Sequence, residues 1–379
     1  MAGYPLPSRL IPLTDAINRN CAISDARDNG IYSMCTLFLR LRNLYKWEHG
    51  KHPWQEAEPA ELLDWIEKKE EQWLDLVEEP FRMLPLGEVT SKPDNVSEVN
   101  QFLSLPETGL LYGAGHGRSL KAIFFLAEIR ENRRIASHPV HILDREFCRE
   151  LSSPFAMHQD GVIYFRLDPF RYFLWDKIQE TEGSKVQAMR FALSEYGLIG
   201  DNGKVKGDRI RDRFEEVVQL EMEPILFHEL GELVPSPLAG PVLSGLIGAY
   251  PDSPVELVVR ATKDILADTC EGGMLRHIIE QEKTSSLGFY VAMLDGMRRE
   301  LFPEFKTAFE KFLQQKDWRL IDDARLSAYN RNLVRAEILS SIAAKLPDRP
   351  AEALIFEIDR KILGPLGLPS LQRSGAHNA

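Results

Sequence analysis

Residues 224–234 read Pro-Ile-Leu-Phe-His-Glu-Leu-Gly-Glu-Leu-Val and predict a helix that is largely buried. Four residues make about one helical turn, so His228 and Glu232 project from the same face, and Glu229 is rotated away by about 100°. Buried acids need partners, because an uncompensated charge in an apolar environment is costly. The stretch therefore predicts a helical fold with a polar site inside it.

An imidazole and a carboxylate one turn apart can bind the same metal ion. His228, Glu229 and Glu232 have the spacing of the His-Glu-x-x-His helix of metallopeptidases, with the last histidine exchanged for glutamate. Glu229, beside His228, could hold a water molecule and take its proton. We therefore expect a metal site on this helix.

A third ligand is expected from a second helix downstream. Residues 263–271 read Lys-Asp-Ile-Leu-Ala-Asp-Thr-Cys-Glu, in which Asp264 and Asp268 lie one turn apart with apolar residues between them. The helix that begins near Glu256 is otherwise apolar on one face. The Asp264 and Asp268 carboxylates are therefore expected to lie on a buried helix.

Together the two segments resemble the two-helix zinc centre of gluzincin metallopeptidases, most nearly the dipeptidyl peptidase III-like group. The resemblance implies that His228, Glu232 and Asp264 are metal ligands, that Asp268 orients a ligand, and that Glu229 is the general base. By analogy with such sites, His277 and Tyr290 are candidates to stabilise an oxyanion.

One imidazole and two carboxylates would cancel the charge of a divalent ion. Zinc is the favoured metal, and the two oxygen ligands make manganese or iron possible. The expected reaction is hydrolysis of a peptide or amide bond by a metal-activated water, with a peptide or a small-molecule amide as substrate.

Other interpretations remain open. Glu221, Glu271 and His277 could join the set in a dinuclear, di-iron or di-manganese type of redox centre. Asp264 and Asp268 could instead be structural partners of Arg260, Lys263 or Arg276, in a protein that is a non-catalytic scaffold.

A glycine-rich stretch offers a different function. Gly113, Gly115 and Gly117 precede Arg118, between an apolar strand and an expected helix through residues 120–126. A strand, a glycine turn and a helix N-terminus bind anions, so a nucleotide or S-adenosylmethionine site is an alternative. Arg118 could equally bind a substrate carboxylate.

Composition limits the partners. The chain has 379 residues, a formal net charge of -11 and a pI near 5.4, which argue against a nucleic-acid-binding surface. Its 4 cysteines are scattered, as expected of reduced thiols in a cytoplasmic protein. We recognise no secretory signal and no apolar run of the roughly 20 residues that span a bilayer. No membrane partner is expected.

The predicted fold is α+β, predominantly helical, with a small sheet in the middle of the chain. We expect three regions: 1–105 with a tryptophan-rich helical hairpin, 106–200 with the glycine-rich loop and short strands, and 201–379 with the metal site. Residues 91–106 are expected to be a linker, residues 235–254 irregular, and the chain after Leu368 disordered. Strands are expected at 140–143 and 162–167, the second at a sheet edge where it could hold an extended peptide.

Overall fold

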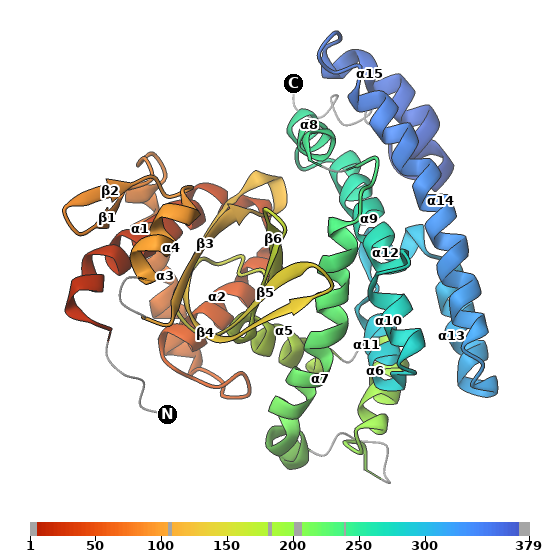
Figure 1. Ribbon diagram of the computed structural model, residues 1–379, viewed down its shortest axis with the longest axis horizontal. Helices are drawn as coiled ribbons and strands as arrows, with labels where there is room; N and C mark the ends of the chain where they lie inside the picture. Colours follow the sequence, from red (N-terminus) through yellow and green to blue (C-terminus); the bar gives the residue numbers. More distant parts are fainter. Residues whose placement is uncertain (1–5, 105–107, 181–183, 201–206, 239, 371–379) are drawn as a thin grey trace. The chain divides into compact units, whose positions relative to one another are not determined.

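The computed structural model describes residues 6–104, 108–180, 184–200, 207–238 and 240–370. The chain divides into two compact units, Met1–Asp176 and Lys177–Ala379. Helices predominate and a small sheet lies in the first unit (Figure 1), which confirms the predicted fold class.

The first unit combines helices with the sheet. Its helices are α1 (Ile11–Asp28), α2 (Met34–Glu48), α3 (Pro59–Leu76) and α4 (Val96–Ser104). Helix α5 (Leu167–Gln179) begins in the first unit and ends in the second. Its strands are β1 (Leu84–Leu86), β2 (Val89–Ser91), β3 (Leu110–His116), β4 (Ala122–Ile135), β5 (His138–Arg149), β6 (Ala156–Gln159) and β7 (Val162–Arg166). The order of the main sheet is β3-β4-β5-β7-β6, with β5 and β7 parallel and the other pairs antiparallel.

Both faces of this sheet are covered. On one face Tyr112 and Leu126 pack with Leu13 of α1, which lies beside the sheet in Figure 1. On the other face Phe125 packs with Leu143. Because α1 and α4 share this core with strands β3 to β5, the two predicted regions 1–105 and 106–200 are joined, and the observed division comes later, after Asp176.

The predicted helix through residues 120–126 is wrong, because this segment forms β4. The run Ala122–Ala127 is apolar throughout, and its alternate side chains enter the two different cores. A strand buried on both faces lacks the polar alternation that distinguishes a strand from a helix.

Three further local predictions need correction. The expected linker at 91–106 contains α4, and Asn95 begins this helix by accepting a hydrogen bond from the Glu98 backbone. Strand β7 lies between β5 and β6, so it is not a sheet edge. The expected irregular stretch 235–254 contains α8 (Pro241–Ala249). The helical hairpin (α2 and α3) and the strands β5 and β7 are confirmed. Of the tail expected after Leu368, residues 371–379 lie outside the described residues.

The described part of the second unit is helical. After α6 (Ser184–Glu195) come α7 (Gly207–Leu233), α8, α9 (Pro254–Thr269), α10 (Met274–Glu280), α11 (Thr284–Met293), α12 (Gly296–Leu301), α13 (Glu304–Gln315), α14 (Arg319–Ala343) and α15 (Ala351–Ile358). One core joins α8, α9, α14 and α15 through residues such as Leu246, Val258 and Leu339.

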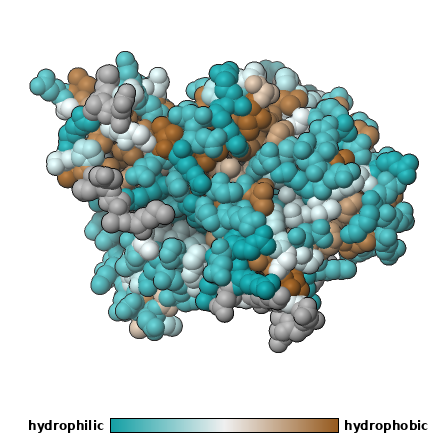
Figure 2. All heavy atoms as spheres, turned by 60° about the horizontal axis from the view of Figure 1, so that its bottom comes forward, coloured by the Kyte–Doolittle hydropathy of each residue, from teal (hydrophilic) through white to brown (hydrophobic). Residues whose placement is uncertain are grey.

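The helices of the described residues do not have the combination of length and apolar character that a bilayer crossing needs. On the face drawn in Figure 2, hydrophilic residues predominate and apolar residues form scattered patches. This surface agrees with a chain in which 27% of the residues are charged.

Candidate metal centre

Helix α7 carries the residues that define the site. It runs from Gly207 to Leu233 and continues through Pro224, so His228 and Glu232 lie one turn apart near its C-terminal end. Leu226 and Leu230 are buried at 0% and 9% exposure, which holds this end of the helix inside the unit. The helical prediction for residues 224–234 is therefore confirmed as far as Leu233.

Helix α9 presents the second pair of acids. Ser253 caps its N-terminus by accepting a hydrogen bond from the Glu256 backbone, and Pro254 occupies the first turn. Val258, Ile265 and Leu266 bury one side of the helix. Asp264 and Asp268 follow one another at a spacing of one turn.

A close backbone contact brings the two helices together. A Cβ atom added at Gly231 would lie 2.1 Å from the carbonyl oxygen of Ala267, which is backbone and cannot rotate away. Only glycine allows this approach. Gly231 lies between His228 and Glu232, and Ala267 lies between Asp264 and Asp268, so the contact sets the two polar pairs opposite each other.

His228, Glu232 and Asp264 form a compact group of possible ligands. One ligand atom from each lies within 4.8 Å of the others, and the His228 Nε2 atom is 3.6 Å from Glu232 Oε1. Two ligands bound to one tetrahedral zinc ion lie about 3.4 Å apart, given metal–ligand distances of about 2.1 Å. The His228–Glu232 separation is close to this value, and Asp264 lies within 4.8 Å of both.

Asp268 occupies a different place, at the other nitrogen of the imidazole. His228 Nδ1 donates to Asp268 Oδ1 at 2.7 Å, and Asp268 Oδ2 accepts from Arg298 Nη2 at 2.6 Å and from Tyr290 at 3.0 Å. Desolvation raises the pKa of the buried Asp268, but Arg298 and His228 outweigh it, and the net pKa is lowered. An ionised Asp268 therefore holds the Nδ1–H group of His228 and leaves Nε2 facing the acids.

The acids around His228 favour its protonated form. Desolvation lowers the pKa of His228, but Asp268 and Glu232 outweigh it and raise the pKa well above its ordinary value. Desolvation also raises the pKa of Asp264, and Glu232 and Asp268 add to this effect against Arg298 and His228. A metal ion would replace the His228 proton as the partner of these acids.

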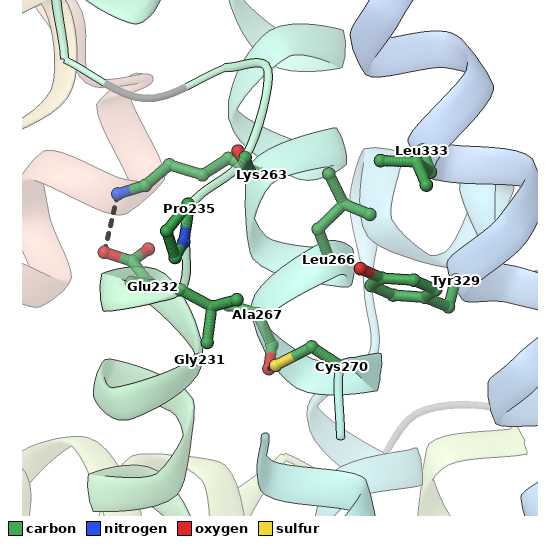
Figure 3. A pocket seen from close by; sticks show the side chains of 11 residues that line it. Gly231, Glu232, Pro235, Lys263, Leu266, Ala267, Cys270, Tyr329 and Leu333 are labelled. Carbon is green, nitrogen blue, oxygen red and sulfur yellow. Dashed lines mark hydrogen bonds and ion pairs between the residues drawn. The ribbon is translucent and has the colours of Figure 1, made fainter. Parts of the chain in front are cut away.

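Lys263 holds the second oxygen of Glu232. Its Nζ atom is 2.6 Å from Glu232 Oε2, as the dashed line in Figure 3 marks, while Oε1 faces His228. The side chains of Lys263 and Glu232 are 22% and 13% exposed, so this pair lies at the edge of the buried cluster. Lys263 thus orients Glu232 with one oxygen toward the ligand group.

The predicted catalytic residues are placed in three different ways. Glu229 is buried at 6% exposure, and one of its carboxylate oxygens lies within 4.8 Å of one of Glu232. Tyr290 donates its hydroxyl hydrogen to Asp268 Oδ2, and its oxyanion role stays a prediction. His277 stacks on Phe227 with ring centroids 3.8 Å apart and is not in the ligand group among the described residues.

Two acids that the dinuclear interpretation adds, Glu221 and Glu271, have partners elsewhere. Glu221 accepts hydrogen bonds from Tyr196 and Ser286, and Glu271 pairs with Arg276 and Arg325. Neither acid belongs to the ligand group. Both carboxylates are bound to other side chains, and the dinuclear centre stays a prediction.

The glycine-rich stretch does not form an anion-binding turn. Gly113 and Gly115 lie within β3, and a Cβ at these positions would meet Phe125 at 2.0 Å and Met157 at 2.6 Å. Gly117 follows in the hairpin to β4, donating its backbone N–H to Lys121 O at 2.8 Å. The glycines therefore make room for side chains of β4 and β6. The side chain of Arg118 lies outside the described residues. The basis for the nucleotide or S-adenosylmethionine alternative is removed.

Arg298 is the site residue that the sequence interpretation missed. It comes from α12, its Nη2 atom contacts Asp268, and its guanidinium lies 5.9 Å from the ring centroid of Tyr290. The cations that were predicted as partners of Asp264 and Asp268 contact other acids instead: Arg260 pairs with Glu256, and Lys263 with Glu232. A buried Asp268 needs a cation nearby, and this need was the one signal in the sequence for Arg298. It did not say which cation would be the partner.

Comparison with protein families gives a match over most of the chain. Residues 12–166 match the N-terminal domain, and residues 171–361 the C-terminal domain, of a family of unknown function (DUF6866). The curated proteins and the solved structures gave no match. The second match covers more than half of the sequence and contains both helices of the candidate metal centre. The chain therefore belongs to the DUF6866 family.

Proposed function

We propose that α7 and α9 bind one divalent metal ion through His228, Glu232 and Asp264, and that this centre hydrolyses an amide or peptide bond. The observation that carries the proposal is the 2.7 Å hydrogen bond between His228 Nδ1 and Asp268. A carboxylate that orients a histidine so that its other nitrogen faces two acids is the usual surrounding of a metal-bound histidine. The reducing compartment that 4 free cysteines favour makes the cytoplasm the proposed location.

The donor set decides which metals are suitable. One imidazole and two carboxylates suit zinc, and their oxygen atoms also suit manganese or iron. The two carboxylates balance the charge of a divalent ion, and Lys263 keeps one oxygen of Glu232 engaged so that the other faces the ion. We therefore propose zinc first.

Glu229 is the proposed general base. A bound divalent ion would acidify a water molecule and polarise the substrate carbonyl. Glu229 lies one residue after His228, is buried, and has an oxygen within 4.8 Å of the Glu232 carboxylate. It would take a proton from the attacking water and deliver it to the departing amine.

The first prediction concerns metal content. Protein purified without chelator should contain about one equivalent of metal per chain, and His228→Ala should contain less than about a tenth of that, because the substitution removes a ligand. Elemental analysis of both proteins measures this. His141→Ala, on β5 of the first unit, is the matched control and should keep the metal.

The metal content of the protein should also depend on pH. Since the pKa of His228 is raised, its proton must leave before Nε2 can bind a metal, and occupancy should increase as pH rises. Wild-type protein without metal after incubation with zinc, manganese and iron would contradict the proposal. The cluster of Lys263, Glu232, Arg298 and Asp268 would then be a structural ion-pair network.

The second prediction concerns activity. Glu229→Gln should keep its metal and lose about 100-fold or more in kcat, because an amide cannot accept the proton of the water. The assay is release of amine from metal-loaded protein with quenched fluorogenic peptides and N-acetylated amino acids. Glu216→Gln, on α7 with a side chain 49% exposed, is the control. Equal rates in Glu229→Gln and wild type would exclude Glu229 as the base.

A further inference from the structure

A small pocket lies beside the proposed ligand group, within the second unit. Its walls come from the end of α7 and the turn after it, from α9, and from α14 (Figure 3). The lining residues are Gly231, Glu232, Val234, Pro235, Ser236, Lys263, Leu266, Ala267, Cys270, Tyr329 and Leu333. Glu232 thus belongs both to the ligand group and to this pocket.

The pocket is apolar on most sides and charged on one. Figure 3 shows Leu266, Leu333 and the Tyr329 ring on one side and the Glu232–Lys263 pair on the other. The pocket is small and open: about 350 Å³ of empty space includes space open to solvent, and a water-sized group can be centred in only about 20 Å³ of it. One compact apolar group fits it better than a long chain.

Lys263 adds an anion-binding capacity next to this apolar wall. Its ammonium group has three donors, and in the described residues Glu232 is the acid paired with it. A side chain that is 22% exposed can therefore contact a ligand without leaving Glu232. The natural partner is a carboxylate.

Long peptides have less support than small substrates. Strand β7 (Val162–Arg166) was expected to hold an extended peptide by main-chain pairing. It lies inside the sheet and is already paired with β5 on one side and with β6 on the other. The argument for peptide binding along that strand is removed. Small substrates need only the pocket and the ligand group.

We infer that the pocket selects N-acylated amino acids, dipeptides included, whose C-terminal residue has a compact apolar side chain and a free carboxylate. The apolar side chain would lie against Leu266 and Leu333, and the carboxylate would bind Lys263, with the amide bond beside Glu232. This inference rests on the proposed function. In the reaction the oxygen of water bonds to the acyl carbon, the C–N bond breaks, and the nitrogen takes a proton, so the products are a carboxylic acid and the free amino acid.

The test compares three substrates on the zinc-loaded full chain. N-acetylleucine should be hydrolysed with a kcat/KM at least about 10-fold higher than N-acetylleucinamide, which lacks the carboxylate, and than N-acetylglycine, which lacks the side chain. Lys263→Met should remove the preference over the amide, mainly through KM. Its metal content is measured in parallel, because Lys263 also contacts Glu232.

Filling the pocket provides a test that does not touch the ligands. Leu333→Trp should remove the preference for leucine over glycine while the metal remains bound, whereas Leu326→Trp, at a position 42% exposed on the same helix, should leave it unchanged. Val234→Trp, at a pocket position 39% exposed, repeats the test if Leu333→Trp does not fold.

The outcomes separate the inference from the proposed function. Hydrolysis that depends on Glu229 but shows no preference among the three substrates would overturn the inference and leave the function standing. If the protein binds no metal, the proposed function fails. Calorimetric titration with N-acetylleucine then tests whether the pocket still binds an acyl-amino acid. Binding that is lost in Leu333→Trp would support the pocket as an acyl-amino-acid site, and no binding by wild type would overturn it.

Discussion

Replacing Gly231 with alanine is expected to destabilise the helical unit by about 3 kcal/mol and to separate the proposed metal ligands. The added Cβ would lie 2.1 Å from the Ala267 carbonyl oxygen and 2.9 Å from its Cα atom. These are backbone atoms of a buried helix, so α7 and α9 must move apart. Because His228 and Glu232 are on one helix and Asp264 is on the other, the ligand group opens with them.

The measurement combines urea unfolding with hydrogen exchange of the amides in α7 and α9. Gly245→Ala is the matched control: Gly245 lies inside α8 and a Cβ there would meet no atom within 4 Å. That substitution should be neutral or stabilise by up to about 1 kcal/mol, because alanine favours a helix more than glycine does. If Gly231→Ala matched wild type in stability and in metal content, the close contact would not be what positions the site.

The site illustrates which features a sequence can reveal. The spacing of His228 and Glu232, and of Asp264 and Asp268, places each pair on one helical face, because the 3.6-residue period is a local property. The meeting of the two pairs is not local. It depends on the contact between Gly231 and Ala267, and a glycine inside a helical pattern does not say which backbone it approaches.

The errors have the same origin. Strand β4 is buried on both faces, so its sequence lacks the alternation that would have identified it, and the glycines of β3 were interpreted as a turn. Their role is visible only when Phe125 and Met157 are in place across the sheet. Arg298 reaches Asp268 from α12, 30 residues along the chain, and no local pattern connects the two. Tertiary contacts, which a single sequence does not show, decide each of these cases.

Glu221→Gln is expected to raise the free energy of unfolding at pH 8 by about 3 kcal/mol and to leave it nearly unchanged at pH 4. Glu221 lies on α7 with 3% exposure and accepts hydrogen bonds from Tyr196 of the segment after α6 and from Ser286 of α11. Desolvation raises its pKa from 4.5 to about 7, against the effect of these hydrogen bonds and of Lys283. The native state therefore holds a proton that the unfolded chain releases at lower pH.

The sign of the pH dependence follows from this difference. Below pH 4.5 both states are protonated and the stabilisation is fully present. Between pH 4.5 and about 7 the native state binds more protons than the unfolded state, so stability falls as pH rises. Above about 7 the carboxylate is ionised in both states and the loss is complete, amounting to about 3 kcal/mol at about 1.4 kcal/mol per pH unit.

Glutamine keeps an oxygen for Tyr196 and Ser286 but cannot ionise, so the decline between pH 4.5 and 7 should disappear in the variant. Urea unfolding at a series of pH values measures it. Glu216→Gln, on the exposed side of the same helix, is the control. A hydrogen bond from Arg213 lowers the pKa of Glu216, so removing this carboxylate cannot abolish a decline in stability between pH 4.5 and 7. A decline of unchanged size in Glu221→Gln would mean that another buried acid causes it. Glu221 accepts hydrogen bonds from Tyr196 and Ser286 and is not in the ligand group. The change should therefore leave the metal content unaltered, which separates the stability of α7 from the metal binding proposed for His228 and Glu232.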